Sequence, residues 1–132
     1  MQKHILIADD NMIVRDIVKT ALAATLDIND YQEAANGREA VERAEQTRPD
    51  LIILDVGMPE MDGVTAAHRL KESMPEIPII LLSIYDLGRD SAKNFGVDAV
   101  VSKQEGWGKL SSEVESLLSF NAEKLRRRMQ LT

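Results

Sequence analysis

Cysteine is absent from the 132-residue sequence, and aromatic residues make up only 4% of it. Without cysteine the chain forms no disulfide bond and no thiolate metal site, so we expect a reducing, cytoplasmic location. No apolar run approaches the roughly 20 residues that span a bilayer. The first residues carry carboxylates where a signal peptide needs its apolar stretch. We therefore expect no membrane partner for this domain.

Positive charge is in short supply. The 16 Lys and Arg residues face 22 Asp and Glu residues, which gives a net charge of −6. An acidic surface argues against direct nucleic-acid binding by this domain. A hydrophobic content of 44% excludes a wholly disordered chain. The length suits one domain, which we expect to cover residues 1–120.

Short apolar runs, rich in Ile, Leu and Val, recur along the chain. They occupy residues 4–8, 51–54, 77–82 and 97–102, with a weaker candidate at 28–33. Most of these runs do not alternate between apolar and polar residues. This pattern indicates strands that are covered on both faces, as in a parallel sheet.

Helical patterns separate the predicted strands. The first expected helix follows Asn11 as its N-cap, and the second runs from near Gly37 to before Pro49. The third covers 64–74, and the fourth covers about 86–95 and ends at Gly96. The fifth begins near Lys109. Five alternations of strand and helix predict a doubly wound α/β domain with five helices. With right-handed crossovers, the flavodoxin-like strand order 2-1-3-4-5 is the expected topology.

Polar side chains follow directly after four of the five predicted strands. They are Asp9, Asp10, Asp55, Ser83 and Lys103. Because all carboxyl ends of a parallel sheet lie along one edge, we expect these side chains to converge. Three neighbouring carboxylates repel one another, and Mg²⁺ relieves such repulsion by binding their oxygens. An aspartate can form an acyl phosphate, which makes Asp55 the expected nucleophile of the set.

Four motifs occur in the order IADDN (7–11), LDVGMPEMDG (54–63), LLS (81–83) and Lys103. As a set, they resemble the receiver domain of bacterial two-component response regulators. The similarity covers about residues 3–119. Further details, ANGREA at 35–40 among them, resemble the NarL-type receivers that precede helix-turn-helix output domains.

The resemblance implies a role for each acidic residue. Asp55 would accept a phosphoryl group from a phosphohistidine of a sensor histidine kinase. Asp10 and Asp55 would bind Mg²⁺ directly and Asp9 through water, with the backbone carbonyl of Gly57 as a further ligand. These expectations agree with the ligand preferences of Mg²⁺.

The resemblance also implies that Ser83 and Lys103 bind the phosphoryl oxygens. A new phosphoryl group adds negative charge and strong acceptors, which would draw these side chains inward. The predicted function is therefore a phosphorylation-dependent switch that controls a partner or output domain. It is not that of a turnover enzyme.

The sequence departs from the family pattern at several positions. Val100 stands where the family usually has Tyr or Phe, Gln104 replaces the usual proline after the lysine, and Ile84 narrows the space next to Ser83. The alternative is therefore a pseudo-receiver, a protein-interaction module that is never phosphorylated. A Mg²⁺-dependent phosphatase fits less well, because that chemistry usually needs an aspartate at the position of Gly57.

The C-terminal residues form an amphipathic, basic extension. No Gly or Pro occurs from 109 to 132, and apolar residues recur at Val114, Leu118, Ala122, Leu125 and Met129. Residues 121–132 carry a net charge of +3, so the rest of the chain carries −9. We expect a long last helix whose end, 121–132, extends the domain or starts a linker. Its apolar stripe would suit a homodimer through the last helices.

Overall fold

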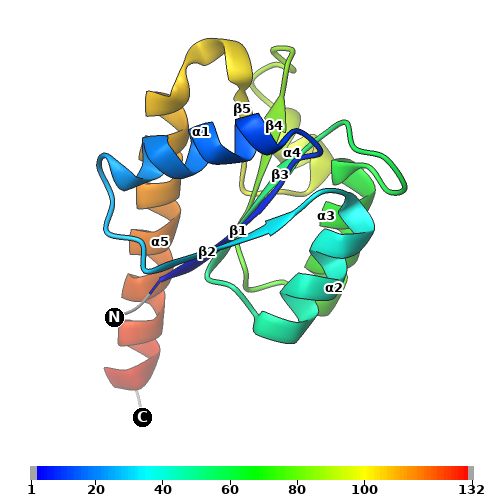
Figure 1. Ribbon diagram of the computed structural model, residues 1–132. Coiled ribbons are helices and arrows are strands. Elements are labelled where there is room, and N and C mark those ends of the chain that lie inside the picture. The colour runs from blue at the N-terminus through cyan, green and yellow to red at the C-terminus, as the bar shows by residue number, and fades with distance from the viewer. Residues whose placement is uncertain (1–2, 131–132) are drawn as a thin grey trace.

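Five parallel strands form the central sheet of the computed structural model, which describes residues 3–130 (Figure 1). The strands are β1 (His4–Ala8), β2 (Asp30–Ala34), β3 (Leu51–Asp55), β4 (Ile79–Ser83) and β5 (Ala99–Ser102). Their order in the sheet is β2-β1-β3-β4-β5. This confirms the predicted flavodoxin-like, doubly wound topology.

Helices cover both faces of the sheet. They are α1 (Met12–Ala23), α2 (Gly37–Thr47), α3 (Gly63–Ser73), α4 (Ser91–Phe95) and α5 (Trp107–Gln130), with a short 3-10 helix, η1 (Lys103–Glu105). Figure 1 shows α1 and α5 on one side of the sheet, and α2 and α3 on the other. None of the helices in the described part of the chain has the length and apolarity that a membrane crossing requires.

Each central strand contributes to two cores. Ile52 and Leu54 of β3 pack under α2 and α3, whereas Leu51 and Ile53 pack under α1 and α5. All four side chains are fully buried. This double coverage explains why the strand sequences are apolar throughout instead of alternating.

Side-chain caps begin three of the helices. The Asn11 side chain accepts a hydrogen bond from the backbone N–H of Ile13, as predicted for the start of α1. Asn36 and Asp62 cap α2 and α3 in the same way. Such caps satisfy backbone donors that have no partner within the helix. They also fix where each helix leaves the carboxyl edge of the sheet.

The boundaries of some elements differ from the predictions. The fourth helix was expected over about 86–95, but α4 covers only Ser91–Phe95. Asp86 instead accepts a hydrogen bond from the N–H of Gly88, whose φ of +92° is not helical. The second strand begins at Asp30 rather than at residue 28. The last helix runs on to Gln130, as expected, and residues 131–132 of the predicted extension lie outside the described residues.

Candidate functional site

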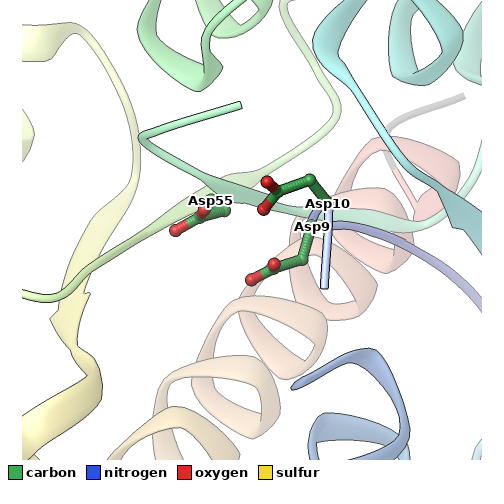
Figure 2. A group of neighbouring side chains, drawn as sticks. All are labelled: Asp9, Asp10 and Asp55. Carbon is green, nitrogen blue, oxygen red and sulfur yellow. The ribbon is translucent and has the colours of Figure 1, made fainter. Parts of the chain in front are cut away.

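Carboxylates from two neighbouring strands meet at the carboxyl edge of the sheet. Asp9 and Asp10 follow β1, and Asp55 is the last residue of β3. One carboxylate oxygen from each of the three lies within 4.8 Å of the others. Figure 2 shows the three side chains gathered at the ends of their strands. The register of the sheet therefore brings together residues that are 46 positions apart in the sequence.

Lys103, which directly follows β5, joins this cluster. Its Nζ lies 3.0 Å from Asp9 Oδ2 and 3.0 Å from Asp55 Oδ1. Asp9 is 1% exposed and Asp55 is 7% exposed, so both pairs are largely shielded from water. Asp10 is exposed. One ammonium group thus pairs with two of the three carboxylates, and the cluster retains negative charge.

Burial perturbs both sides of this ion pair. It raises the pKa of Asp55, and the opposing hydrogen bond from Lys103 only partly offsets this. The charges of Asp9 and Asp10 raise the pKa of Asp55 further. Burial would lower the pKa of Lys103, but its hydrogen bonds to Asp9 and Asp55 and their charges raise it above its ordinary value. Lys103 therefore stays protonated at neutral pH.

Asp9 is held on several sides. Its N–H donates to the Ala34 carbonyl at 3.0 Å, and its Oδ1 accepts from the Asn11 N–H at 2.9 Å. Its Oδ2 accepts from Lys103. These contacts leave the Asp9 carboxylate little freedom to turn.

The loop after Asp55 is closed by tight backbone packing. The Gly63 N–H donates to the Val56 carbonyl at 2.9 Å, and a Cβ at Gly63 would lie 2.0 Å from the Asp55 carbonyl oxygen. Only glycine fits this approach. The Asn36 side chain donates to Glu60 at 2.7 Å and ties the same loop to the start of α2. The position of Gly57 in this loop is thus fixed from both ends.

Ser83 lies beside Asp55 at the end of β4. It is 4% exposed, and its Oγ accepts a hydrogen bond from the Tyr85 N–H at 3.0 Å. Asp55, Gly57 and Ser83 line one hollow of about 310 Å³, with Ile84 and Tyr85 at its side. The hydroxyl proton of Ser83 is not used in that hydrogen bond and can be donated to a ligand in the hollow.

The sequence-predicted residues therefore converge, with one addition. Asp9, Asp10, Asp55 and Lys103 form the acidic cluster, while Ser83 and Gly57 line the adjoining hollow. Arg15 was not predicted. Its Nη1 donates to the Asp9 carbonyl at 2.6 Å. The only sequence signal was a basic residue four positions after the N-cap Asn11, and this does not identify a contact to a backbone carbonyl.

Comparison with known proteins gives consistent matches. A family profile described as response regulator receiver domain matches residues 5–115. The response regulator protein VraR of Staphylococcus saprophyticus is 30% identical, over 98% of this chain and 66% of its own length. A protein-glutamate methylesterase/protein-glutamine glutaminase of Methanosarcina acetivorans is 44% identical, over 59% of this chain and 22% of its own length. The chain thus spans 22% to 66% of the length of these curated relatives.

A solved structure is similar over most of its length. The signal receiver domain of a signal transduction histidine kinase from Syntrophus aciditrophicus is 39% identical and superposes with a TM-score of 0.77. The match covers 89% of this chain and 90% of that one.

Proposed function

Since the chain belongs to the response regulator receiver domain family, whose members are phosphorylation-dependent signalling modules of two-component systems, we propose that Asp55 is its phosphoacceptor. One observation carries this proposal: three carboxylates and one lysine meet at the end of β3. Asp55 alone among the three acids both belongs to this cluster and lines the hollow beside Ser83. An incoming phosphoryl group therefore has space at Asp55.

The donor set fits Mg²⁺. Hard oxygen ligands suit this ion, and three carboxylates paired with one lysine leave charge for a divalent cation to balance. Asp9, Asp10 and Asp55 would hold the ion, with the Gly57 carbonyl as a further ligand. When bound, Mg²⁺ neutralises negative charge on phosphoryl oxygens.

The protein's own residues account for the rest of the transfer. A carboxylate oxygen of Asp55 forms a bond to phosphorus while the bond from phosphorus to the donor's histidine nitrogen breaks. The bonding electron pair stays on the imidazole. Lys103 moves from Asp9 to a phosphoryl oxygen, and the Ser83 hydroxyl donates to another. Transfer of this kind needs mainly position and charge neutralisation.

The donor is a sensor histidine kinase, and the phosphorylated domain controls a partner or output domain in the cytoplasm without turning over a substrate. To shift two conformations from a ratio of 1:99 to 99:1, the phosphoryl group must interact more favourably with one conformation than with the other by about 5.5 kcal/mol. Several charge-assisted hydrogen bonds can supply this difference. Because Val100 stands where the family usually has Tyr or Phe, no aromatic side chain at this position can transmit the signal. Lys103 is the first residue of η1, and only Gly106 separates η1 from α5, so this segment is the proposed route of the signal.

Phosphoacceptor mapping tests the proposal. The purified chain is incubated with Mg²⁺ and acetyl phosphate, and its intact mass is measured. We expect the added mass of one phosphoryl group in the wild type and in Asp27→Asn, which alters an exposed aspartate. Asp55→Asn should gain none. Phosphorylation of the Asp55→Asn variant at the wild-type level would exclude Asp55.

A pseudo-receiver is the second candidate, and Val100 is the observation that favours it. It would fold identically and bind partners without phosphorylation. Beryllofluoride with Mg²⁺ separates the two functions, since it mimics the phosphoryl group. Spectral changes at residues 83–105 support the switch, whereas an unchanged spectrum together with no mass gain supports the pseudo-receiver.

A further inference from the structure

Arg15 connects the loop that carries the acidic pair to the edge strand of the sheet. It lies in the first turns of α1, and only 14% of its side chain is exposed. Its Nη1 donates to the Asp9 carbonyl at 2.6 Å, and its Nε donates to Glu33 Oε1 of β2 at 2.9 Å. One guanidinium group therefore binds a backbone oxygen and a carboxylate at the same time, a geometry that suits its planar fork of donors.

Glu33 holds the guanidinium group in place. Its second oxygen accepts a hydrogen bond from Lys19 Nζ at 3.0 Å. The hydrogen bonds from Lys19 and Arg15 lower the pKa of Glu33, so this carboxylate is ionised at neutral pH. Lys19 also pairs with Asp16, but it makes no hydrogen bond to Asp9. Lys19 and Arg15 thus share Glu33, and Arg15 alone extends the network to the acidic cluster.

Among the three acids of the cluster, Asp10 is the one whose carboxylate orientation depends most on the backbone. Asp9 and Asp55 both bind Lys103, whereas within the described residues no side-chain partner holds the exposed Asp10 carboxylate. The peptide group between Asp9 and Asp10 is fixed on its carbonyl side by Arg15. The next N–H, that of Asn11, is fixed by Asp9 Oδ1. These two contacts set the direction in which the Asp10 side chain leaves the chain.

We propose that Arg15 is a positioning residue for the Mg²⁺ site, which fixes the Asp9–Asp10 peptide and thereby presents the Asp10 carboxylate to the ion. This inference rests on the proposed function, because it assumes that the acidic cluster binds Mg²⁺. Arg15 binds the Asp9 backbone carbonyl and none of the carboxylate oxygens of Asp9, Asp10 and Asp55 that would hold the ion. Residues that orient metal ligands in this way typically change metal affinity about 10- to 100-fold when replaced.

Binding of Mg²⁺ alone, measured by isothermal titration calorimetry, tests the proposal. Arg15→Gln removes the contacts to Asp9 and Glu33. Lys19→Gln is the matched control, which removes the contacts of Lys19 to Glu33 and Asp16 and leaves the Arg15 contact to Asp9 in place. We expect Arg15→Gln to weaken Mg²⁺ binding about 10-fold, and Lys19→Gln to stay near the wild type. In the metal-free amide NMR spectrum, the Asp10 and Asn11 signals should move in Arg15→Gln and keep their positions in Lys19→Gln.

The outcomes separate this inference from the proposed function. If the wild type binds no Mg²⁺ and gains no phosphoryl group, the proposed function fails. If the wild type binds Mg²⁺ and Arg15→Gln binds it as tightly as Lys19→Gln does, Arg15 has no positioning role and the proposed function stands. If Arg15→Gln does not fold, Arg15→Lys replaces it in the test, because a single ammonium group cannot reproduce the contacts to both Asp9 and Glu33. It should also weaken binding, and wild-type affinity in Arg15→Lys would overturn the proposal.

Discussion

At the scale of single residues, the dominant feature is an imbalance of charge. Asp9 and Asp55 are buried and share the one ammonium group of Lys103, while Asp10 lies close by. Burial and the neighbouring acids make the ionised form of Asp55 unfavourable, as its raised pKa shows. The ionised Asp55 therefore destabilises the metal-free fold locally, and the same negative charge makes the site attractive to a cation.

Asp55→Asn should stabilise the metal-free protein at neutral pH, by an amount on the order of 1 kcal/mol. The substitution keeps the shape of the side chain and removes its unfavourable charge. Because the pKa of Asp55 is raised in the folded state, the folded wild type gains its proton first as the pH falls. The variant should thus have a higher free energy of unfolding than the wild type at neutral pH, and this difference should shrink at acidic pH. Urea unfolding in chelator over a pH series measures this.

Asp27→Asn is the control for that series, since Asp27 is exposed and lies outside the cluster. It should match the wild type at every pH. An Asp55→Asn variant less stable than the wild type at neutral pH in chelator would show that pairing with Lys103 outweighs the burial of the carboxylate.

At the scale of elements, the contact between the end of β3 and the start of α3 sets the position of Asp55. Gly63 lies against the Asp55 carbonyl oxygen, where a Cβ would come within 2.0 Å. Asp62 caps the same helix by accepting a hydrogen bond from Thr65 N–H at 2.7 Å. The helix start and the strand end therefore cannot move independently.

Gly63→Ala should destabilise the protein by about 3 kcal/mol, because the rigid backbone on both sides must separate to admit the methyl group. Gly57→Ala is a matched control in the same loop, since a Cβ there meets nothing within 4 Å. It should change stability by less than about 0.5 kcal/mol. The midpoints of urea unfolding compare the two, and equal midpoints would contradict the packing described for Gly63.

Much of this architecture can be predicted from the sequence. Apolar runs such as 51–54 mark strands because a parallel sheet buries both faces. Asn11 marks the start of α1 through its capping side chain. The convergence of Asp9, Asp55 and Lys103 follows from the shared carboxyl edge of the strands.

Other features depend on contacts that no side-chain pattern reveals. The fourth helix is shorter than its sequence suggested, because the turn at Asp86 and Gly88 competes with helix formation before Ser91. Arg15 acts on a backbone carbonyl, and its partner Glu33 comes from another strand. The sequence thus predicted that the acidic side chains converge at one edge of the sheet, but it did not predict the contacts that hold them there.

At the scale of the whole molecule, ligand binding acts on stability. The proposed Mg²⁺ site exists only in the folded state, because its carboxylates come from β1 and β3. Binding to the folded state alone raises the free energy of unfolding by mass action.

Mg²⁺ at about 100 times its Kd should therefore stabilise the protein by about 2.7 kcal/mol, and chelator should remove the gain. Thermal unfolding with and without Mg²⁺ measures the effect. Asp10→Asn removes one ligand and should respond much less. If Mg²⁺ raised the unfolding temperature of Asp10→Asn as much as that of the wild type, the ion would bind at another site.

The end of α5 leads to a proposal about assembly. Beyond Leu118, the helix exposes Phe120 and Leu125 next to a run of basic side chains, Lys124 and Arg126–Arg128. We propose that residues 1–120 form the receiver domain and that 121–132 pair with a second copy. Light scattering should give a dimer mass for the full chain and a monomer mass for a chain ending at Ser119. Monomer masses for both would exclude the pairing.

The length of α5 has a mechanical consequence. The helix begins two residues after η1, whose first residue is Lys103, and continues for 24 residues to Gln130. At about 1.5 Å per residue, it is a rod about 36 Å long. A tilt of about 5° at its origin swings the far tip by about 3 Å over that length. We propose that the helix acts as a lever, in which a small displacement of Lys103 becomes a larger displacement at the far end of α5.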